Sequence, residues 1–296
     1  MKQLSVVVTC TERKIAAVSP ELQVRALPPG TVDHRVGMWH ERLGLGTSAV
    51  PLMNLYQGEH WVQTRLLLET ARAAGFSPRL WVASAGLGLQ PASASFPAYA
   101  ATFSPRHHDT VAPTGVDRRL WWKALGRRMG TPRLADLGGR RSVLLVLSEG
   151  YANVLEGEVR ELAGTGDEVV LVGGAGDVEG IHRIRADGSL RSALGGTMTG
   201  LNARMASAWL SRCADGRLIS PTTKGVWTRW VNRVRIEERH NRVPMTDAQV
   251  KSYIGKAVLD HPGSSRTRLH RMLRDSGKAC EQKRFAQLFA EMMGEQ

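Results

Sequence analysis

Residues 142–174 decide the fold, and they read SVLLVLSEGYANVLEGEVRELAGTGDEVVLVGG. The runs Ser142–Leu147 and Glu168–Val172 are short, continuous and rich in Val and Leu, which is typical of buried strands. Between them, Tyr151–Ala163 has the apolar spacing of a helix, and Gly173 ends the second strand. The stretch therefore predicts a strand–helix–strand unit, for which right-handed parallel pairing is the default.

A second unit of the same kind precedes it. Leu4–Thr9 predicts a buried strand, Glu59–Ala74 a helix, and Leu80–Ala85 the next strand. Apolar strands that alternate with helices indicate an α/β fold with a mostly parallel open sheet. Residues 19–51 are rich in Pro and Gly and predict an irregular excursion. Residues 182–197 predict a hairpin or loop, and Thr199–Arg212 a further helix.

The C-terminal quarter has a different pattern. Ala248–Leu259, Arg266–Arg274 and Ala279–Met293 predict three helices separated by short Gly-containing turns. This order is typical of a helix-turn-helix, and a plain helical bundle is the alternative. We therefore expect an α/β catalytic domain over residues 1–221, with a basic connector at 117–141. A small basic helical domain is expected over 222–296.

Composition excludes several classes of protein. The 296 residues are 42% hydrophobic and 23% charged, the balance of an ordinary globular chain. No apolar run approaches the roughly 18 residues of a spanning helix, so no membrane partner is expected. Cys10, Cys213 and Cys280 lie far apart and predict neither a disulfide framework nor a metal site. The predicted location is a reducing cytoplasm, without a secretory signal in the apolar start of the chain.

The positive charge is concentrated in two segments. Residues 117–141 carry eight Lys/Arg against two Asp/Glu, and residues 224–296 carry fifteen against eight. These excesses, six and seven, account for the whole net charge of +13. Such segregation favours a polyanionic partner, and we expect double-stranded DNA. The side chains expected to contact DNA are Arg13, Lys14, His108, Arg118, Arg119, Lys123, Arg127, Arg128, Arg204, Arg266, Arg268, Arg271, Lys278, Lys283 and Arg284.

The ends of the predicted strands carry small and polar residues. In parallel α/β sheets the ligand lies beyond the carboxyl ends of the strands. The glycines there match neither a dinucleotide-binding nor an ATP-binding fingerprint. The residues expected to line a base pocket are Cys10, Thr11, Tyr56, Ser84, Tyr99, Ser148, Tyr151 and Asn202.

Two carboxylates are candidates for catalysis. Asp109 follows His107 and His108 in a polar loop, and Glu59 enters the first helix. A carboxylate can activate water or stabilise a cationic transition state. The alternatives are a capping role for Asp109 and compensation of the helix N-terminus by Glu59.

Several of these motifs together resemble a family linked to modified bases. Cys10-Thr11-Glu12-Arg13-Lys14, Leu55-Tyr56-Gln57-Gly58, Ser84-Ala85-Gly86-Leu87-Gly88-Leu89 and the segment Pro97–Phe103 carry the resemblance. The α/β domain is similar to the catalytic core of archaeosine synthase, and related domains occur among proteins of 7-deazaguanine DNA modification. The overall plan also resembles a bacterial phage-defence DNA glycosylase that removes glucosylated hydroxymethylcytosine.

The resemblance implies a DNA glycosylase of antiviral defence that flips a modified base out of phage DNA and leaves an abasic site. Asp109 is the expected catalyst with Glu59 second, and no cofactor is required. The first alternative is a base-modifying enzyme of the 7-deazaguanine type, in which Cys10 attacks a nitrile. The second alternative is a DNA-binding transcription regulator with a ligand-sensing α/β domain.

Overall fold

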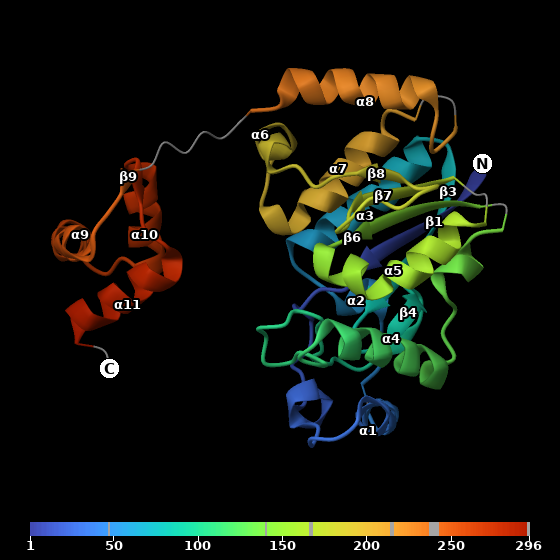
Figure 1. The fold of residues 1–296 in the computed structure, drawn as a ribbon, viewed down its shortest axis with the longest axis horizontal. Coiled ribbons are helices and arrows are strands. Elements are labelled where there is room, and N and C mark those ends of the chain that lie inside the picture. Colours follow the sequence, from blue (N-terminus) through green and yellow to red (C-terminus); the bar gives the residue numbers. More distant parts are fainter. Residues whose placement is uncertain (47, 140, 166–167, 214–215, 237–242, 295–296) are drawn as a thin grey trace. The chain divides into compact units, whose positions relative to one another are not determined.

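A six-stranded sheet organises the larger part of the chain in the computed structural model (Figure 1). The structure describes residues 1–294 except 47, 140, 166–167, 214–215 and 237–242. The strand order is β4-β3-β1-β6-β7-β8. The strands are β1 (Lys2–Thr9), β3 (Phe76–Ser84), β4 (Gly88–Pro91), β6 (Ser142–Leu147), β7 (Val169–Gly173) and β8 (His182–Ile184).

In this six-stranded sheet, all strands except β4 run parallel. Val6 at the centre of β1 pairs with Leu80 of β3 on one side and with Leu144 of β6 on the other. The antiparallel edge strand β4 returns directly along β3, pairing Leu89 with Ala83. The predicted α/β fold with a mostly parallel sheet is therefore confirmed.

Helices cover both faces of this sheet, which is why its central strands are buried and almost wholly apolar. Helices α3 (Glu59–Ala73) and α7 (Leu201–Leu210) pack together on one face. Helix α5 (Glu149–Ala163) lies on the other face and contacts α4 (Gly115–Met129), as Figure 1 shows. The shorter elements are β2 (Val50–Pro51), α2 (Leu52–Leu55), β5 (Ser95–Phe96) and α6 (Arg191–Leu194).

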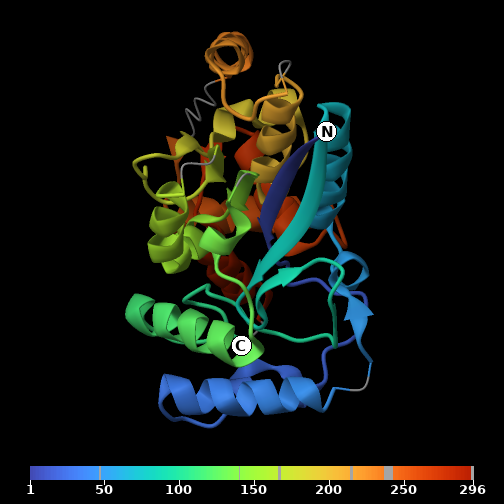
Figure 2. The same cartoon turned by 90° about the vertical axis from the view of Figure 1, so that its right-hand side faces the viewer.

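The excursion at 19–51 is not irregular throughout, as the sequence predicted, because it contains helix α1 (Val32–Gly44). Thr31 caps this helix by accepting from the His34 N–H, and Val36, Trp39 and Leu43 are buried at helical spacing. Figure 2 shows α1 and α4 side by side across the ends of the strands.

Other predicted boundaries are also corrected. Residues 182–197 form no hairpin, because β8 pairs parallel to β7 and is followed by α6. The second strand begins at Phe76, four residues earlier than predicted, since its whole length pairs with β1. Helix α5 begins at Glu149, two residues earlier.

The chain divides into two compact units, Met1–Ile236 and Glu237–Gln296. The predicted boundary at 221/222 therefore falls earlier than the observed one. Helix α8 (Pro221–Val234) belongs to the first unit, where Trp227 packs edge-to-face on Trp209 of α7 at 5.7 Å between ring centroids.

The second unit has its own apolar core. Its helices are α9 (Asp247–Asp260), α10 (Arg266–Asp275) and α11 (Gln282–Met293). Ile254, Leu269 and Phe285, one from each helix, are fully buried together. A two-residue parallel ladder joins β9 (Val243–Pro244) to β10 (Lys278–Ala279), so the last helix begins at Gln282 rather than at the predicted Ala279.

Candidate functional site

The parallel strands are wound in two directions from β1. The chain moves from β1 to β3 on one side and to β6 on the other, so the direction reverses between β1 and β6. Ligands of open α/β sheets bind in the crevice at this switch point, outside the carboxyl ends of the strands. Here Cys10 follows β1, and Tyr151 lies in the first turn of α5 after β6.

One hydroxyl joins three strand ends at the switch point. Tyr151 Oη lies 3.1 Å from Cys10 Sγ and accepts a hydrogen bond from the Ala85 N–H, also at 3.1 Å. Burial raises the pKa of the Tyr151 phenol well above its ordinary value, and Cys10 adds to this shift. The hydroxyl therefore keeps its proton beside the partly exposed Cys10 thiol.

A second set of hydroxyls lies beneath the surface. Tyr99 Oη lies 2.5 Å from both Tyr56 Oη and Ser84 Oγ, and the Gly86 N–H donates to Ser84 Oγ at 3.1 Å. Burial raises the pKa of both tyrosines well above the ordinary value. All three side chains are at most 1% exposed. These three residues were predicted to line the base pocket, but they are buried and instead form a hydrogen-bonded layer beneath it.

Lys14 is turned into the protein. Its ammonium donates to the carbonyls of Thr11 and Glu12 at 3.2 and 3.1 Å, and lies 4.5 Å from the centroid of the Tyr99 ring. Burial lowers the pKa of Lys14, and the charges of Cys10, Glu12 and Asp109 partly oppose this. The predicted phosphate contact is therefore corrected, because the ammonium faces the hydroxyl network.

Asp109 is a buried carboxylate in the same region. Its side chain is 6% exposed, accepts from the Arg25 N–H at 3.3 Å and pairs with the Arg25 guanidinium at 3.6 Å. Its loop touches the loop after β1, where His107 Nε2 lies 3.2 Å from Glu12 Oε1. The structure thus places the loop of the first predicted catalyst against the loop that follows β1.

Glu59 has a different environment. It accepts from the N–H of Thr197 at 3.0 Å and from the hydroxyl of the same residue, and it forms an ion pair with Arg204. The Arg204 side chain is only 10% exposed, so its predicted contact with DNA is also corrected. Glu59 therefore joins α3 to the loop before α7, which is a structural role.

The remaining predicted pocket residues lie around the edge. Asn202 Nδ2 donates to the Leu147 carbonyl at 3.1 Å, at the end of β6. Thr11 Oγ1 donates to the carbonyls of Arg13 and Gln57, at 2.9 and 3.2 Å. Ser148 is exposed at the start of α5.

Three side chains at this edge were not predicted to belong to the site. Trp39 of α1 and Trp121 of α4 donate their indole N–H groups to the carbonyls of Gly86 and Ala85, at 2.7 and 2.8 Å. His60 Nε2 lies 3.0 Å from the Thr9 carbonyl, and burial lowers the His60 pKa. Of these three, only His60 had a signal in the sequence, because it lies in the first turn of the helix that connects β1 to β3.

Most of the predicted DNA-contacting side chains are exposed. Arg284 is the partial exception in α11, where it donates to Asp247 at 2.7 Å. Arg118 is half-buried, and its Nη1 is buried. The exposed ones are Arg13, His108, Arg119, Lys123, Arg127, Arg128, Arg266, Arg268, Arg271, Lys278 and Lys283.

Within the described part of the chain, no group of three or more His, Cys, Asp or Glu side chains is arranged to hold a metal ion. In the same residues, every helix is too short or too polar to cross a bilayer. Comparison with protein-family models, with curated proteins and with solved structures found no match to this chain.

Proposed function

We propose that this chain is a DNA glycosylase that excises a modified base, with glucosylated hydroxymethylcytosine as the first candidate. The observation that carries the proposal is the buried Asp109 carboxylate, held by Arg25 in the loop that adjoins the switch point. Cleavage of an N-glycosidic bond builds positive charge on the sugar, and a fixed buried carboxylate stabilises that charge.

In this mechanism the sugar of a flipped nucleotide faces Asp109. The carboxylate stabilises the oxocarbenium ion as the base leaves with the bonding electron pair. It then takes a proton from the attacking water, and this proton passes to the departed base. The ordered Tyr56–Tyr99–Ser84 hydroxyls fix the strand ends behind the reacting atoms. The products are a free base and an abasic site.

The second unit supports DNA as the partner. Helices α9, α10 and α11 contact one another, and Gly277 makes the turn before α11 with a φ of +78°. Arg266, Arg268 and Arg271 are exposed on α10, and Lys283 is exposed at the start of α11. A compact three-helix unit with cations on its last two helices suits a helix-turn-helix that grips phosphates while a base is flipped.

The test is incubation of the purified chain with DNA that carries ordinary, hydroxymethylated, glucosylated or 7-deazaguanine bases. We expect a free modified base in the mass spectrum and a matching alkali-induced strand break. Asp109→Asn should lower the rate by about 100-fold or more. Glu41→Gln, which alters an exposed carboxylate of α1, is the matched control and should keep full activity. Absence of strand breaks in every DNA would overturn the proposal.

A base-modifying reaction is the second candidate, because the partly exposed Cys10 thiol lies at the switch point in contact with Tyr151. The thiol would add across the nitrile of a 7-deazaguanine base, forming a carbon–sulfur bond while the nitrile nitrogen gains a proton. Cys10→Ala would then abolish a mass change on an unreleased base. Under the glycosylase proposal, the same variant retains most of its activity.

A further inference from the structure

Helix α4 presents a basic face to solvent. Val116, Arg119, Leu120, Lys123 and Arg127 follow the spacing of one helix side, and all five are exposed. At 1.5 Å per residue, the three cations extend over about 12 Å of the helix axis. Duplex DNA presents roughly seven phosphates over such a length.

The two other basic residues of α4 have structural roles. Arg118 buries its Nη1 atom, and Arg128 pairs with Asp33 of α1 at 3.5 Å. The Arg128 guanidinium also covers Gly37, because a Cβ built on that glycine would lie 3.5 Å from it. Arg128 therefore helps to hold α1, whereas Arg119, Lys123 and Arg127 lie on the exposed face.

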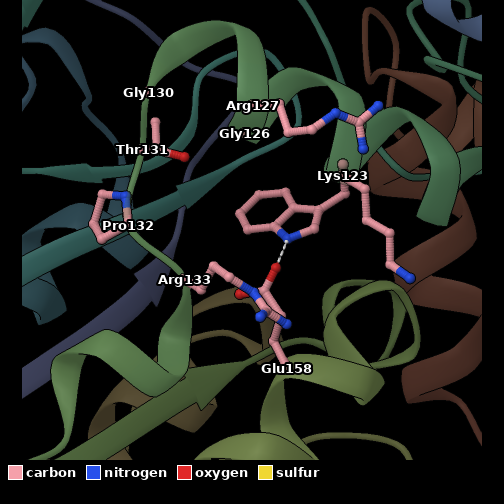
Figure 3. A pocket seen from close by; sticks show the side chains of 9 residues that line it. Lys123, Gly126, Arg127, Gly130, Thr131, Pro132, Arg133 and Glu158 are labelled. Carbon is pink, nitrogen blue, oxygen red and sulfur yellow. Dashed lines mark hydrogen bonds between the residues drawn. The ribbon is translucent and has the colours of Figure 1, made fainter.

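A groove continues this basic face at the C-terminal half of α4 (Figure 3). Its volume is about 550 Å³, and its rim carries Lys123 and Arg127 of α4 together with Arg133. Gly130 adjoins it with a φ of +60°, and a Cβ added there would have open space around it. A chain of linked phosphates and sugars can therefore approach the backbone closely.

The acidic side chains in and beside the groove are already engaged. Glu158 of α5 accepts from Trp122 Nε1 at 2.6 Å and from the Leu134 N–H at 2.9 Å. Glu161 of the same helix, which does not line the groove, forms an ion pair with Arg133 of its rim. Arg127 has only a 4.0 Å contact with Asp33, so it remains available to an external anion.

We infer that this face of α4, with its groove, binds the sugar–phosphate backbone of the nucleic acid. The inference rests on the nucleic-acid substrate proposed above. Exposed Val116 and Leu120 suit contact with the sugars, and the cations between and beyond them suit the phosphates. Helix α4 begins six residues after Asp109 and crosses the strand ends (Figure 2). A backbone bound here therefore passes beside the candidate site.

The experiment measures binding of the full chain to a labelled 20-base-pair duplex of ordinary sequence, across a series of KCl concentrations. The slope of log K against log salt is negative, and each lost phosphate contact makes it less steep by about 0.9. We expect the double variant Lys123→Gln/Arg127→Gln to make this slope less steep by about 1.8 and to weaken binding at least tenfold at low salt. The matched control, Arg65→Gln/Arg72→Gln, removes two exposed cations of α3 and should keep the parent slope.

A slope within 0.5 of the parent value in the Lys123/Arg127 variant, with an unchanged melting temperature, would overturn the inference. An equal loss in the α3 control would overturn it too, because it would show dependence on net charge alone. The measurement needs no modified base. Failure of the proposed excision reaction therefore leaves the slope change intact, and the two failures remain distinguishable.

Discussion

At the scale of single residues, the Tyr99 hydroxyl is the point on which the buried part of the site depends. It is within hydrogen-bonding distance of both Tyr56 and Ser84, and the Tyr99 ring also lies under the Lys14 ammonium. A buried hydroxyl that loses its partner bears the cost of desolvation without compensation. This one oxygen is a partner of both groups, and Ser84 Oγ also accepts from the Gly86 N–H.

Tyr99→Phe should therefore lower the free energy of unfolding by about 1–3 kcal/mol, because it leaves Ser84 and Tyr56 each without this partner. Urea denaturation followed by tryptophan fluorescence measures the change. Tyr56→Phe removes only one end of the network and should cost less. Equal stability of Tyr99→Phe and the parent chain would contradict the assignment of these hydrogen bonds.

Residue identities at the strand ends could be predicted from the sequence, but their partners could not. Cys10, Ser84 and Tyr151 follow recognisable strands, and the parallel sheet brings them to one edge. Asp109 and Glu59 were also found, yet Arg25 lies 84 residues from Asp109, and Arg204 lies 145 residues from Glu59. No local pattern indicates which cation pairs with which carboxylate, so these two ion pairs could be found only from the structure.

At the scale of elements, the ion pair of Glu59 with Arg204 fixes the loop 195–200 against the start of α3. Gly195 and Gly196 both have a φ of +72°, and the Thr197 that follows is bonded to Glu59 through its N–H and hydroxyl. The loop contains few apolar anchors, and Met198 is 57% exposed. Its position therefore depends on this polar contact.

Glu59→Ala should loosen the loop and lower the free energy of unfolding by about 1–3 kcal/mol, because the largely buried Arg204 side chain would lose its carboxylate partner. Limited proteolysis should cleave within 195–200 faster than in the parent chain. Glu69→Ala, on the exposed side of the same helix, serves as the control and should leave cleavage unchanged. Faster cleavage elsewhere, with the loop intact, would contradict the anchoring of this loop by Glu59.

The strands were easier to predict than the helices outside the sheet. Continuous Val and Leu runs identify β1, β6 and β7, because strands covered on both faces have to be apolar throughout. Helix α1 was missed because Pro and Gly surround it and only Val36, Trp39 and Leu43 form its buried stripe. The start of β3 was difficult to predict for a related reason. Ser77, Pro78 and Arg79 are half-buried or exposed, so the first half of Phe76–Ser84 has no continuous apolar run.

At the scale of the whole molecule, the two compact units differ greatly in size, and each has its own core. A unit of 60 residues is expected to have a stability of only about 3–9 kcal/mol. All eight tryptophans lie before residue 237, so their fluorescence reports on the larger unit alone.

Phe285→Ala should unfold the smaller unit selectively, because removing a fully buried phenylalanine costs about 3–5 kcal/mol. We expect a partial loss of helical circular dichroism and weaker DNA binding, while the tryptophan-monitored transition stays in place. Met292→Ala, an exposed change on the same helix, should leave both signals intact. A common shift of both signals would show instead that the units unfold together.

The central position of β1 affects how the chain is made. This strand is synthesised before the other strands of its sheet, but one of its two neighbours, β6, ends only at Leu147. At about 5–20 residues per second, synthesis of the intervening chain takes roughly 7–28 s. During that time the Val6–Val8 segment waits with an open, strongly apolar edge. Slow translation between codons 9 and 147 should therefore increase aggregation of the nascent chain and its demand for chaperones.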